Sequence, residues 1–335
     1  DVDRRSYRDR DPPPVVSFMS GTRILCLGAG EGWHAKQLRT AAADLGCRLA
    51  LASYETLRSS ISDHGLRVAC EAGAIADFDV VLTRTMPAGS LEQITFRLAT
   101  LHALSPGSPL SPGSLRSSGS PARVIPIVNS PRGLEIAIDK FATLGVVAGL
   151  GYAVPETTVV QSRGEAIDAF RALGGDCVVK PIFGGEGRGV MRISDPELAW
   201  YTFSTLEKLD AVCYVQRFVP PGGRDTRLLV IGDEVLGVRR TSSRDFRTNV
   251  AGGGRCESIR VSESNRTMAL KICQQIGLKF ASVDLIDDDE SSGRVVEVNG
   301  IPGWKGAQQV ITESIADRLV NLLIREASPI IGAVG

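Results

Sequence analysis

Apolar residues recur along this chain with two different periods, one typical of buried strands and one typical of helices. The runs Arg23–Gly28, Arg48–Tyr54 and Phe78–Thr83 are short and apolar, as buried strands are. A segment with helical character covers about His34–Leu45, between the first two runs. Strands that alternate with helices predict a parallel α/β unit at the start of the chain.

Polar residues next to these elements occupy positions typical of caps and ligand contacts. Ser90 is expected to cap a helix whose apolar stripe belongs to the core. The stripe consists of Leu91, Ile94, Leu98 and Leu101. Arg84 follows the third strand, where α/β units tend to place ligand contacts, whereas Arg97 on the helix is expected to be solvated.

Three glycines after the first strand, Gly28, Gly30 and Gly32, allow two interpretations. A tight strand-to-helix turn requires glycine in any case. A dinucleotide-binding site would use the same turn, with Glu55 roughly where a ribose-binding acid is expected. The spacing is G-x-G-x-G rather than G-x-G-x-x-G, so we favour the turn.

Lys180 ends an apolar strand, Cys177–Pro181, and a glycine-rich segment, Gly184–Gly189, follows directly. A lysine in such a strand is desolvated, which costs free energy unless it meets an anion. A glycine-rich loop between this strand and the next, from Val190, forms a flap whose backbone N–H groups can close over phosphates. A flexible hairpin is the alternative, but the lysine beside the glycines favours a phosphate site.

Two β-rich runs late in the chain, Phe280–Asp287 and Arg294–Asn299, flank a polar connection and predict an antiparallel hairpin. If the turn lies at the middle of this connection, Asp284 faces Glu297, and Asn299 shares the face of Glu297. Such an all-oxygen set suits a hard cation such as magnesium. Buried carboxylates need a cation or a basic partner; solvent-facing acids beside an Asn-Gly turn are the alternative.

The strands Arg224–Ile231 and Glu234–Thr241 form another predicted hairpin, in a stretch rich in arginine and without lysine. Arg227 and Arg240 are expected to share a face, where guanidinium groups can recognise carboxylate or phosphate. An ordinary charged sheet face is the alternative. Nucleic-acid binding is less favoured because no interleaved aromatic residues or basic helix accompany the arginines.

Composition narrows the classes of function. The 335 residues contain 38 Lys plus Arg and 38 Asp plus Glu, so no net charge attracts nucleic acid or an anionic membrane. The seven cysteines are scattered singly, which argues against a disulfide scaffold or structural zinc and indicates a cytoplasmic location. No apolar run approaches membrane-spanning length.

In their order and spacing, these motifs resemble the ATP-grasp superfamily and, within it, the RimK-type carboxylate–amine ligases. The resemblance runs from about Asn129 to Glu326. Its markers are DK at 139–140, VVKP at 178–181, GGEGRGV at 184–190, QRFV at 216–219, RDTRLLVIGDEV at 224–235, RR at 239–240, DFRTN at 245–249, VDLI at 283–286 and EVNGIPG at 297–303. Segments 82–97, 129–140 and 299–306 look most like ligases of tetrahydromethanopterin- or methanofuran-linked C1 pathways.

The resemblance implies a nucleotide site between two lobes. The two lysines would contact the phosphates under the glycine loop, residues 216–219 would hold adenine, and Asp225 would lie on the ribose side. The implied nucleotide-binding set is Lys140, Lys180, Gly184, Gly185, Glu186, Gly187, Arg188, Gly189, Gln216, Arg217, Phe218, Val219 and Asp225. Arg217 stands where relatives usually have an acidic residue, so only backbone contacts are carried over there.

The remaining roles concern the reaction itself. The implied catalytic set, which would face the substrate carboxylate and the transferred phosphoryl group, is Arg227, Arg240, Arg247 and Asn249. The implied ligands of two magnesium or manganese ions are Asp284, Glu297 and Asn299, which agrees with the hairpin reasoning above.

The implied activity is amide formation in which ATP phosphorylates a carboxylate and an amine then displaces phosphate. The implied partners are ATP, L-glutamate or another amino acid, and a carboxylate acceptor. The acceptor would be a small molecule or a protein, such as a tetrahydromethanopterin-type cofactor or a ribosomal-protein-like chain. No nucleic acid or membrane partner is expected, and the sequence leaves the oligomeric state open, a homo-oligomer included.

The implied fold is the ATP-grasp fold, of the α/β class with an α+β C-terminal part and an N-terminal parallel α/β domain. Residues 1–20 are expected to be a disordered extension, and 21–122 the N-terminal domain with a flexible linker at 105–122. Residues 123–215 would form the central lobe, and 216–330 the C-terminal lobe with the metal site.

Two other classes of function are considered. A non-catalytic ATP-binding regulatory module would keep the fold without turnover, and the intact carboxylate and amide set at residues 284, 297 and 299 speaks against it. A nicotinamide-dependent dehydrogenase built on residues 22–55 would bind NADH and need no metal.

Overall fold

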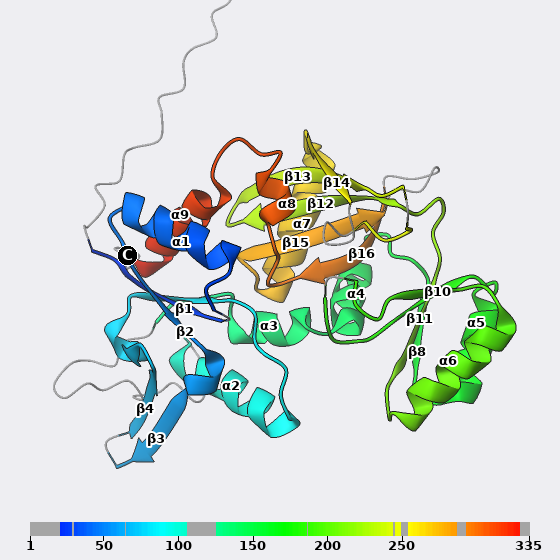
Figure 1. The fold of residues 1–335 in the computed structure, drawn as a ribbon, viewed down its shortest axis with the longest axis horizontal. Helices are drawn as coiled ribbons and strands as arrows, with labels where there is room; N and C mark the ends of the chain where they lie inside the picture. Colours follow the sequence, from blue (N-terminus) through cyan, green and yellow to red (C-terminus); the bar gives the residue numbers. More distant parts are fainter. Residues whose placement is uncertain are drawn as a thin grey trace, which may run out of the picture.

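The structure, a computed structural model, describes residues 21–28, 30–63, 65–105, 125–185, 187–243, 245–248, 254–286 and 293–328. We divide this part of the chain into an N-terminal unit (21–128), a central unit (157–217) and a C-terminal unit (131–150 and 224–328) (Figure 1). A parallel sheet comes first and antiparallel sheets with helices follow, which confirms the predicted mixture of α/β and α+β architecture.

The N-terminal unit is built on a parallel sheet with the strand order β2-β1-β6-β7. Its strands are β1 (Arg23–Leu27), β2 (Arg48–Ala52), β6 (Val80–Thr83) and β7 (Ile127–Val128), and its helices are α1 (Trp33–Asp44) and α2 (Leu91–Leu104). All four residues of β6 are buried, as expected for an inner strand of a parallel sheet covered on both faces. The predicted parallel unit is confirmed.

A second, antiparallel sheet extends from the N-terminal unit and was not predicted from the sequence (Figure 1). Its strands are β3 (Arg58–Ser62), β4 (Gly65–Cys70) and β5 (Gly73–Ala74). Every residue of β3 is exposed. Its sequence, RSSIS, therefore lacks the alternation of apolar and polar residues by which a half-buried strand is found.

Helix α2 confirms one expectation and contradicts two. The Ser90 hydroxyl caps the helix, because it accepts a hydrogen bond from the N–H of Gln93. Leu91, expected in the core, is 79% exposed. Arg97, expected in solvent, is only 4% exposed and donates from Nη1 to the Pro87 carbonyl oxygen at 2.7 Å.

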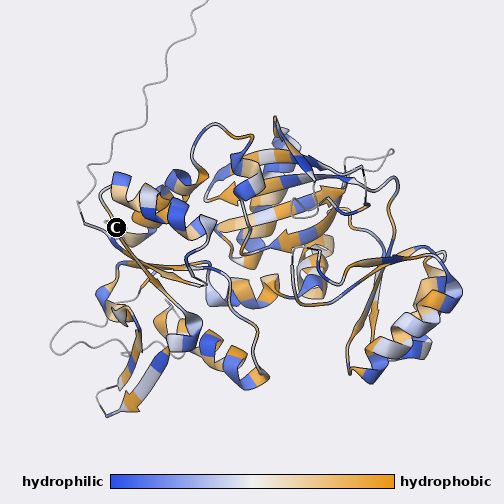
Figure 2. Cartoon of the chain, viewed as in Figure 1, coloured by the Kyte–Doolittle hydropathy of each residue, from blue (hydrophilic) through white to orange (hydrophobic). Residues whose placement is uncertain are grey.

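The central unit has its own sheet, with the strand order β10-β9-β11-β8, and its own core. Its elements are β8 (Thr157–Val160), α5 (Arg163–Ala172), β9 (Cys177–Lys180), β10 (Met191–Ile193), α6 (Pro196–Lys208) and β11 (Cys213–Arg217). Helices α5 and α6 cover one face of this sheet through residues such as Phe170 and Phe203. Their remaining surface mixes hydrophilic and hydrophobic residues (Figure 2).

The C-terminal unit contains an antiparallel sheet with the order β14-β13-β12-β15-β16. Its elements are α3 (Pro131–Ala137), α4 (Lys140–Gly149), β12 (Arg224–Ile231), β13 (Glu234–Thr241), β14 (Arg255–Ile259), α7 (Glu263–Ile276), β15 (Phe280–Ile286), β16 (Arg294–Asn299), α8 (Lys305–Gln308) and α9 (Ile315–Ala327). Helix α4 packs on β16 and α7, and Val147 of α4 belongs to the core of this unit. Residues 131–150 therefore pack with the C-terminal sheet.

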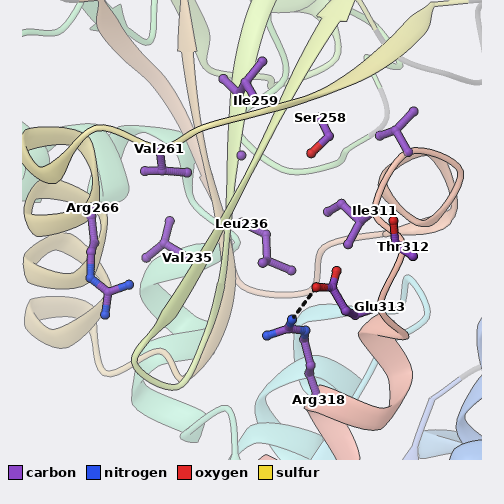
Figure 3. Close-up of a pocket in the computed structure, with 12 residues that line it drawn as sticks. Val235, Leu236, Ser258, Ile259, Val261, Arg266, Ile311, Thr312, Glu313 and Arg318 are labelled. Atoms are coloured by element: carbon purple, nitrogen blue, oxygen red, sulfur yellow. Dashed lines mark ion pairs between the residues drawn. The ribbon is translucent and has the colours of Figure 1, made fainter. Parts of the chain in front are cut away.

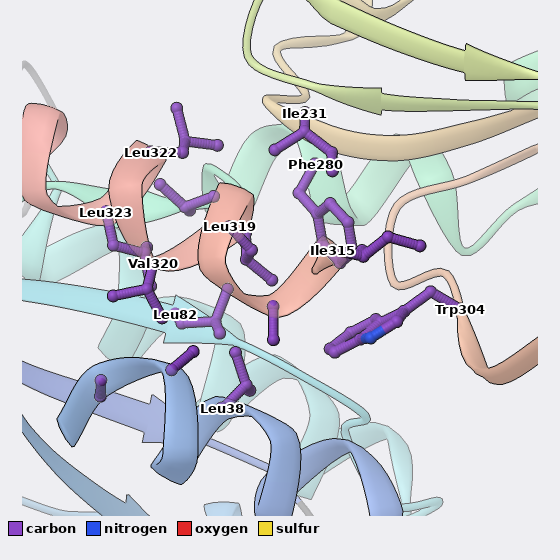
Figure 4. Close-up of a cluster of buried hydrophobic side chains, with 14 of the residues drawn as sticks. Leu38, Leu82, Ile231, Phe280, Trp304, Ile315, Leu319, Val320, Leu322 and Leu323 are labelled. Carbon is purple, nitrogen blue, oxygen red and sulfur yellow. The ribbon is translucent and has the colours of Figure 1, made fainter. Parts of the chain in front are cut away.

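One continuous core joins the N-terminal and C-terminal units. Leu38 of α1 and Leu82 of β6 pack with Leu319 of α9, and the same cluster reaches Phe280 of β15 and Trp304 (Figure 4). The central unit does not contribute to this cluster within the described residues. None of the described helices is both long and apolar enough to cross a membrane.

Candidate active site

The late acidic hairpin forms with the predicted register. Strand β15 runs antiparallel to β16, and Asp284 is the direct partner of Glu297. Asp284 is 3% exposed, whereas Glu297 and Asn299 are half-buried. The predicted pairing of these two carboxylates is therefore confirmed, and one of them lies inside the protein.

Two arginines compensate the buried Asp284 carboxylate. Its Oδ1 accepts a hydrogen bond from Arg227 Nε at 2.8 Å, and its Oδ2 accepts from Arg227 Nη2 at 2.6 Å and Arg240 Nη2 at 2.9 Å. Arg227 on β12 is the cross-strand partner of Asp284, which explains the two parallel bonds. Of the two kinds of partner that the sequence analysis considered, the basic one is thus observed, as Arg227 and Arg240.

The network continues through Arg240 to a second buried carboxylate. Nε and Nη2 of Arg240 donate to Oδ1 and Oδ2 of Asp225, each at 2.7 Å, and the Thr248 hydroxyl also donates to Asp225. Burial alone would raise the pKa of the Asp284 carboxyl, but the charges of Arg227 and Arg240 outweigh burial and hold this pKa below its usual range. Asp225, expected on the ribose side, is thus enclosed between Arg240 and Thr248.

Glu297 differs from Asp284 because it contacts no arginine. Its carboxylate makes no hydrogen bond or ion pair with any residue in the part of the chain that the structure describes. Its charge acts on Lys140 and Lys180, whose pKa values it raises against the effect of burial. Two lysines and one free carboxylate therefore meet between the central unit and the C-terminal sheet.

Both lysines are held by neutral oxygen atoms. Lys180 Nζ donates to Gln216 Oε1 at 2.7 Å, and Lys140 Nζ donates to the Gly184 carbonyl oxygen at 2.5 Å. Burial lowers the pKa of Lys180 to about 8, with a further lowering by the charge of Lys140, while Glu297 raises it. Both groups are suited to take up an anion such as a phosphate, since neither has a carboxylate partner within hydrogen-bonding distance among the described residues.

The glycine-rich segment follows Lys180 as predicted. Gly184, Gly187 and Gly189 have positive φ angles, of 109°, 71° and 70°. A side chain at Gly189 would also place its Cβ 2.8 Å from Cγ of Pro181. The Arg188 N–H donates to the Gly185 carbonyl at 3.2 Å. The segment thus needs glycine at several positions for its backbone path, which agrees with a flap formed mainly by backbone groups.

The segment expected to hold adenine ends strand β11. Gln216 points towards Lys180, whereas Arg217 points away and pairs with Glu156 at 2.7 Å. Phe218 and Val219 are buried. The N–H groups of Arg217 and Phe218 donate to backbone carbonyls, but the Val219 N–H has no acceptor among the described residues. This leaves Val219 as the available backbone donor of the segment.

The remaining predicted residues lie near the flap or outside the described residues. Arg247 pairs with Asp245 and donates from Nη1 to the Val190 carbonyl at 3.3 Å, which joins the 245–248 segment to the end of the flap. Glu186 and Asn249 fall outside the residues that the structure describes. Their predicted roles, in nucleotide binding and catalysis respectively, stay predictions.

Two residues that the sequence analysis did not single out hold the site together. The buried Asn129 side chain donates from Nδ2 to the carbonyls of Phe280 and Gly300, each at 2.6 Å, and its Oδ1 accepts from the N–H of Phe280 at 2.9 Å. Thr248 completes the Asp225 network. An Asn before Ser-Pro was a weak signal, because its partners are 150 or more residues away.

A divalent cation fits this donor set in part. Glu297 offers a free carboxylate, and Asn299 Oδ1 already accepts one hydrogen bond, from the N–H of Ile301 at 2.9 Å. Both oxygens of Asp284 accept from arginine, so a cation there would compete with Arg227. The all-oxygen donors suit magnesium or manganese, and they are most available at Glu297 and Asn299.

A separate cavity of about 350 Å³ lies against β13, β14 and residues 310–313 (Figure 3). Its walls include Leu236, Ile259 and Ile311, and Arg318 and Glu313 face each other at its edge with a 3.7 Å ion pair. None of the predicted nucleotide-binding, catalytic or metal-binding residues lines it. The cavity is therefore distinct from the site around Glu297.

Comparison with known proteins places this geometry in context. A family model described as the RimK-like ATP-grasp domain matches residues 137–323. A tetrahydromethanopterin:alpha-L-glutamate ligase of Methanosarcina acetivorans is 29% identical over 82% of this chain and 90% of its own length. An alpha-aminoadipate–LysW ligase, LysX, of Sulfolobus acidocaldarius is 32% identical over 59% of this chain and 73% of its own.

Solved structures share the fold. The ATP-grasp ligase PsnB, in complex with a phosphomimetic variant of its minimal precursor, Mg and ADP, superposes with a TM-score of 0.66. It covers 92% of this chain and 99% of its own, with 20% sequence identity. At this identity the likeness concerns the fold.

Proposed function

This chain belongs to the RimK-like ATP-grasp family and is an ATP-dependent ligase, and we propose that it joins the amino group of L-glutamate to a carboxylate acceptor. The observation that carries this proposal is the position of two lysines at the glycine-rich segment: Lys140 Nζ donates to the Gly184 carbonyl oxygen and Lys180 Nζ to Gln216 Oε1, with the charge of Glu297 acting on both. Lysines beside a glycine-rich flap, with no carboxylate contact in the described part of the chain, are suited to the phosphates of ATP.

The chain's own residues account for the first step. An oxygen of the acceptor carboxylate attacks the γ-phosphorus, and the bond between the γ-phosphorus and the oxygen that bridges to the β-phosphate breaks. ADP departs, and the acceptor becomes an acyl phosphate. Lys140 and Lys180 would hold the phosphates, with the adenine against Val219 and its free N–H. Arg227 and Arg240 keep the sheet face rigid through Asp284 and Asp225. The closed flap excludes water, which would hydrolyse the acyl phosphate.

The second step forms the amide. The neutral amine of the amino acid attacks the acyl carbon, the bond to phosphate breaks, and the amine proton leaves with the phosphate or a nearby base. We propose that Glu297 and Asn299, with Asp284, hold magnesium or manganese when ATP is bound. Such ions neutralise charge that develops on the phosphates. Arg247, which contacts the flap at Val190, would follow its closure.

The names of the relatives support the choice of substrates. Relatives over most or much of the chain are named as ligases of alpha-L-glutamate to tetrahydromethanopterin and of alpha-aminoadipate to LysW. We propose L-glutamate as the amine, and a small molecule such as a tetrahydromethanopterin-type cofactor, or a protein carboxylate, as the acceptor.

The test uses the full chain with ATP, magnesium, each of the common amino acids and a panel of acceptors, with ADP release and product mass as readouts. The panel includes tetrahydromethanopterin and a peptide with a C-terminal glutamate. We expect ADP release that requires both L-glutamate and one acceptor, and a product heavier by glutamyl units. Glu156→Gln, an exposed glutamate paired with Arg217, is the matched control and keeps full activity. ADP release without any amide product would contradict the proposal.

A further inference from the structure

Two arginines are buried at the carboxyl edge of the N-terminal sheet without a carboxylate. Arg84 follows β6 and is 9% exposed, and Arg97 of α2 packs beside the segment that β6 leads into. Arg84 Nη1 donates to the Pro302 carbonyl at 3.1 Å, and its guanidinium lies 4.8 Å from the centre of the Trp304 ring. Neither arginine forms an ion pair with any described residue.

Burying these two arginines without a counter-charge costs free energy of folding. In the C-terminal unit this cost is reduced, because Arg227 and Arg240 contact carboxylates. Burying a charge is unfavourable unless a counter-charge or several hydrogen bonds replace water. Nε and Nη2 of Arg84 donate to no acceptor among the described residues. The Tyr54 hydroxyl, on which the charges of Arg84 and Arg97 both act, is also buried without a hydrogen-bond partner in the described part of the chain. The edge is thus positively charged and incompletely hydrogen-bonded.

The place of Arg84 in the fold is one where ligands bind. In parallel α/β sheets, ligands occupy the space beyond the carboxyl ends of the strands. Arg84 comes directly after β6 and its N–H donates to the Leu27 carbonyl at the end of β1. Gly28 has a φ of +154°, and a Cβ there would lie 2.6 Å from Cβ of Arg84. A glycine at this position is what allows Arg84 to sit between the two strand ends.

One peptide unit connects Arg84 with the proposed reaction centre. The Pro302 carbonyl accepts from Arg84, and the carbonyl of the next residue, Gly303, accepts from Arg227 Nη1 at 3.5 Å. Arg227 in turn holds Asp284. A ligand at Arg84 would therefore lie beside the sheet face on which Asp284 and Glu297 meet.

We propose that Arg84 forms a subsite for a carboxylate of a substrate that does not react at that carboxylate. The proposal rests on the proposed function, because it concerns which part of a ligase substrate is held there. L-Glutamate carries two carboxylates and reacts through its amine, so it offers such a group. An acceptor with more than one carboxylate offers one as well, and the experiment separates the two sources.

The first experiment measures binding by calorimetry, with the full chain saturated with ADP and magnesium. The probes are L-glutamate and its two amides, L-glutamine and L-isoglutamine, each of which lacks one carboxylate. We expect the parent protein to bind L-glutamate about tenfold or more tightly than one of the two amides. Arg84→Gln is expected to bind that acid and that amide equally, and Arg84→Lys to restore part of the preference.

The control variant is Arg39→Gln, an arginine of α1 whose side chain is about half exposed and pairs with Glu31 at 3.6 Å. It is expected to keep the parent preference for acid over amide. Unchanged ADP affinity in each variant shows that the protein is folded. A purely structural role of Arg84 would weaken the binding of acid and amide by the same factor, and that result would overturn the subsite.

The second experiment identifies the source of the carboxylate from steady-state kinetics of Arg84→Gln and Arg84→Lys. A rise of about tenfold in KM for L-glutamate, with KM for the acceptor unchanged, assigns the subsite to the amino acid; the reverse assigns it to the acceptor. Unchanged KM for both overturns the subsite while amide formation by the parent still upholds the ligase. Acid-over-amide preference that depends on Arg84, without amide formation by the parent, upholds the subsite and overturns the ligase.

Discussion

Buried arginines are compensated in the C-terminal unit and left uncompensated in the N-terminal unit. Arg240 contacts the carboxylates of both Asp225 and Asp284. Arg84, equally buried, contacts a backbone carbonyl and aromatic rings and forms no ion pair among the described residues. Arginine therefore has two roles in this protein. In the C-terminal unit it holds carboxylates in position, and in the N-terminal unit we propose that its charge binds a carboxylate of a substrate.

Lys180 lies between these two cases. It is held by the neutral Gln216 side chain, and the carboxylate that acts on it, Glu297, is not within ion-pair distance. Glu297 in turn is the acid of the sheet face that lacks an arginine. The compensated charge of Arg240 contributes to the stability of the fold, whereas we propose that the uncompensated charges of Lys180 and Glu297 meet substrates.

The largest effect is expected for Glu297→Gln, because this carboxylate has no hydrogen-bond or ion-pair partner among the described residues and its charge acts on the two lysines. Turnover should fall about 100-fold or more, since charge stabilisation at transferred phosphates is worth several kcal/mol. The free energy of unfolding should change by less than about 0.5 kcal/mol. ADP release and urea unfolding are the measurements. Activity close to that of the parent, with Glu156→Gln as reference, would remove Glu297 from the site.

Arg240→Met is expected to have the largest effect on stability. It leaves Asp225 and Asp284 buried without this guanidinium, and such a loss costs about 3–5 kcal/mol of unfolding free energy. Acid should reduce the loss, because protonation removes the charge of the orphaned carboxylates. Urea unfolding at pH 7 and pH 5 measures both effects. A loss below about 1 kcal/mol at pH 7 would show that the network contributes little to stability.

The pH dependence of ADP binding tests the role of Lys180, whose charge is only partly compensated. In the fold, burial lowers the pKa of Lys180 from its ordinary 10.5 to about 8, so Lys180 is charged at pH 7 and loses its proton as pH rises through about 8. ADP binding should then be about tenfold weaker at pH 9 than at pH 7. Lys180→Arg should remove this dependence because guanidinium stays charged. The exposed Lys208→Arg is the matched control and should behave as the parent.

The smallest effect is expected for Arg84→Met in the absence of substrates. Removal of an uncompensated buried charge offsets the lost cation–π contact with Trp304, which is worth about 1 kcal/mol. The free energy of unfolding should therefore stay within about 1 kcal/mol of the parent. Urea unfolding of Arg84→Met beside Arg240→Met measures the contrast directly. An equal loss of unfolding free energy in the two variants would show that buried arginines contribute alike to stability in the N-terminal and C-terminal units.

Local patterns in the sequence predicted the acidic hairpin well. The pairing of Asp284 with Glu297 agrees with the count of residues across the connection, but a register shift between Asp284 and Leu285 contributes to it, because Leu285 pairs with Val295 and Ile286 with Arg294. The bounds of the strands β12 and β13 also agree with the prediction. Lys180 beside the glycine-rich flap was found because an isolated lysine in an apolar strand is conspicuous.

Contacts between distant segments could not be found in this way. Asp284 pairs with Arg227 across 57 residues, and this partner depends on the order of strands in the sheet. Arg97 was wrongly expected in solvent, because helical spacing does not show that a second element covers its face. The sheet β3-β4-β5 was missed because β3 and β5 are exposed and carry no hydrophobic signal, and only Val68 and Cys70 of β4 are buried.

The N-terminal and C-terminal units share one hydrophobic core and are therefore expected to move together. The central unit has a separate core. A hinge motion during nucleotide entry would accordingly swing the central unit. It would carry Lys180 away from Glu297 without disturbing the contact of Arg84 with Pro302. We expect the proposed subsite at Arg84 to keep its shape whether the central unit is open or closed over the nucleotide, so that its ligand and ATP can bind in either order.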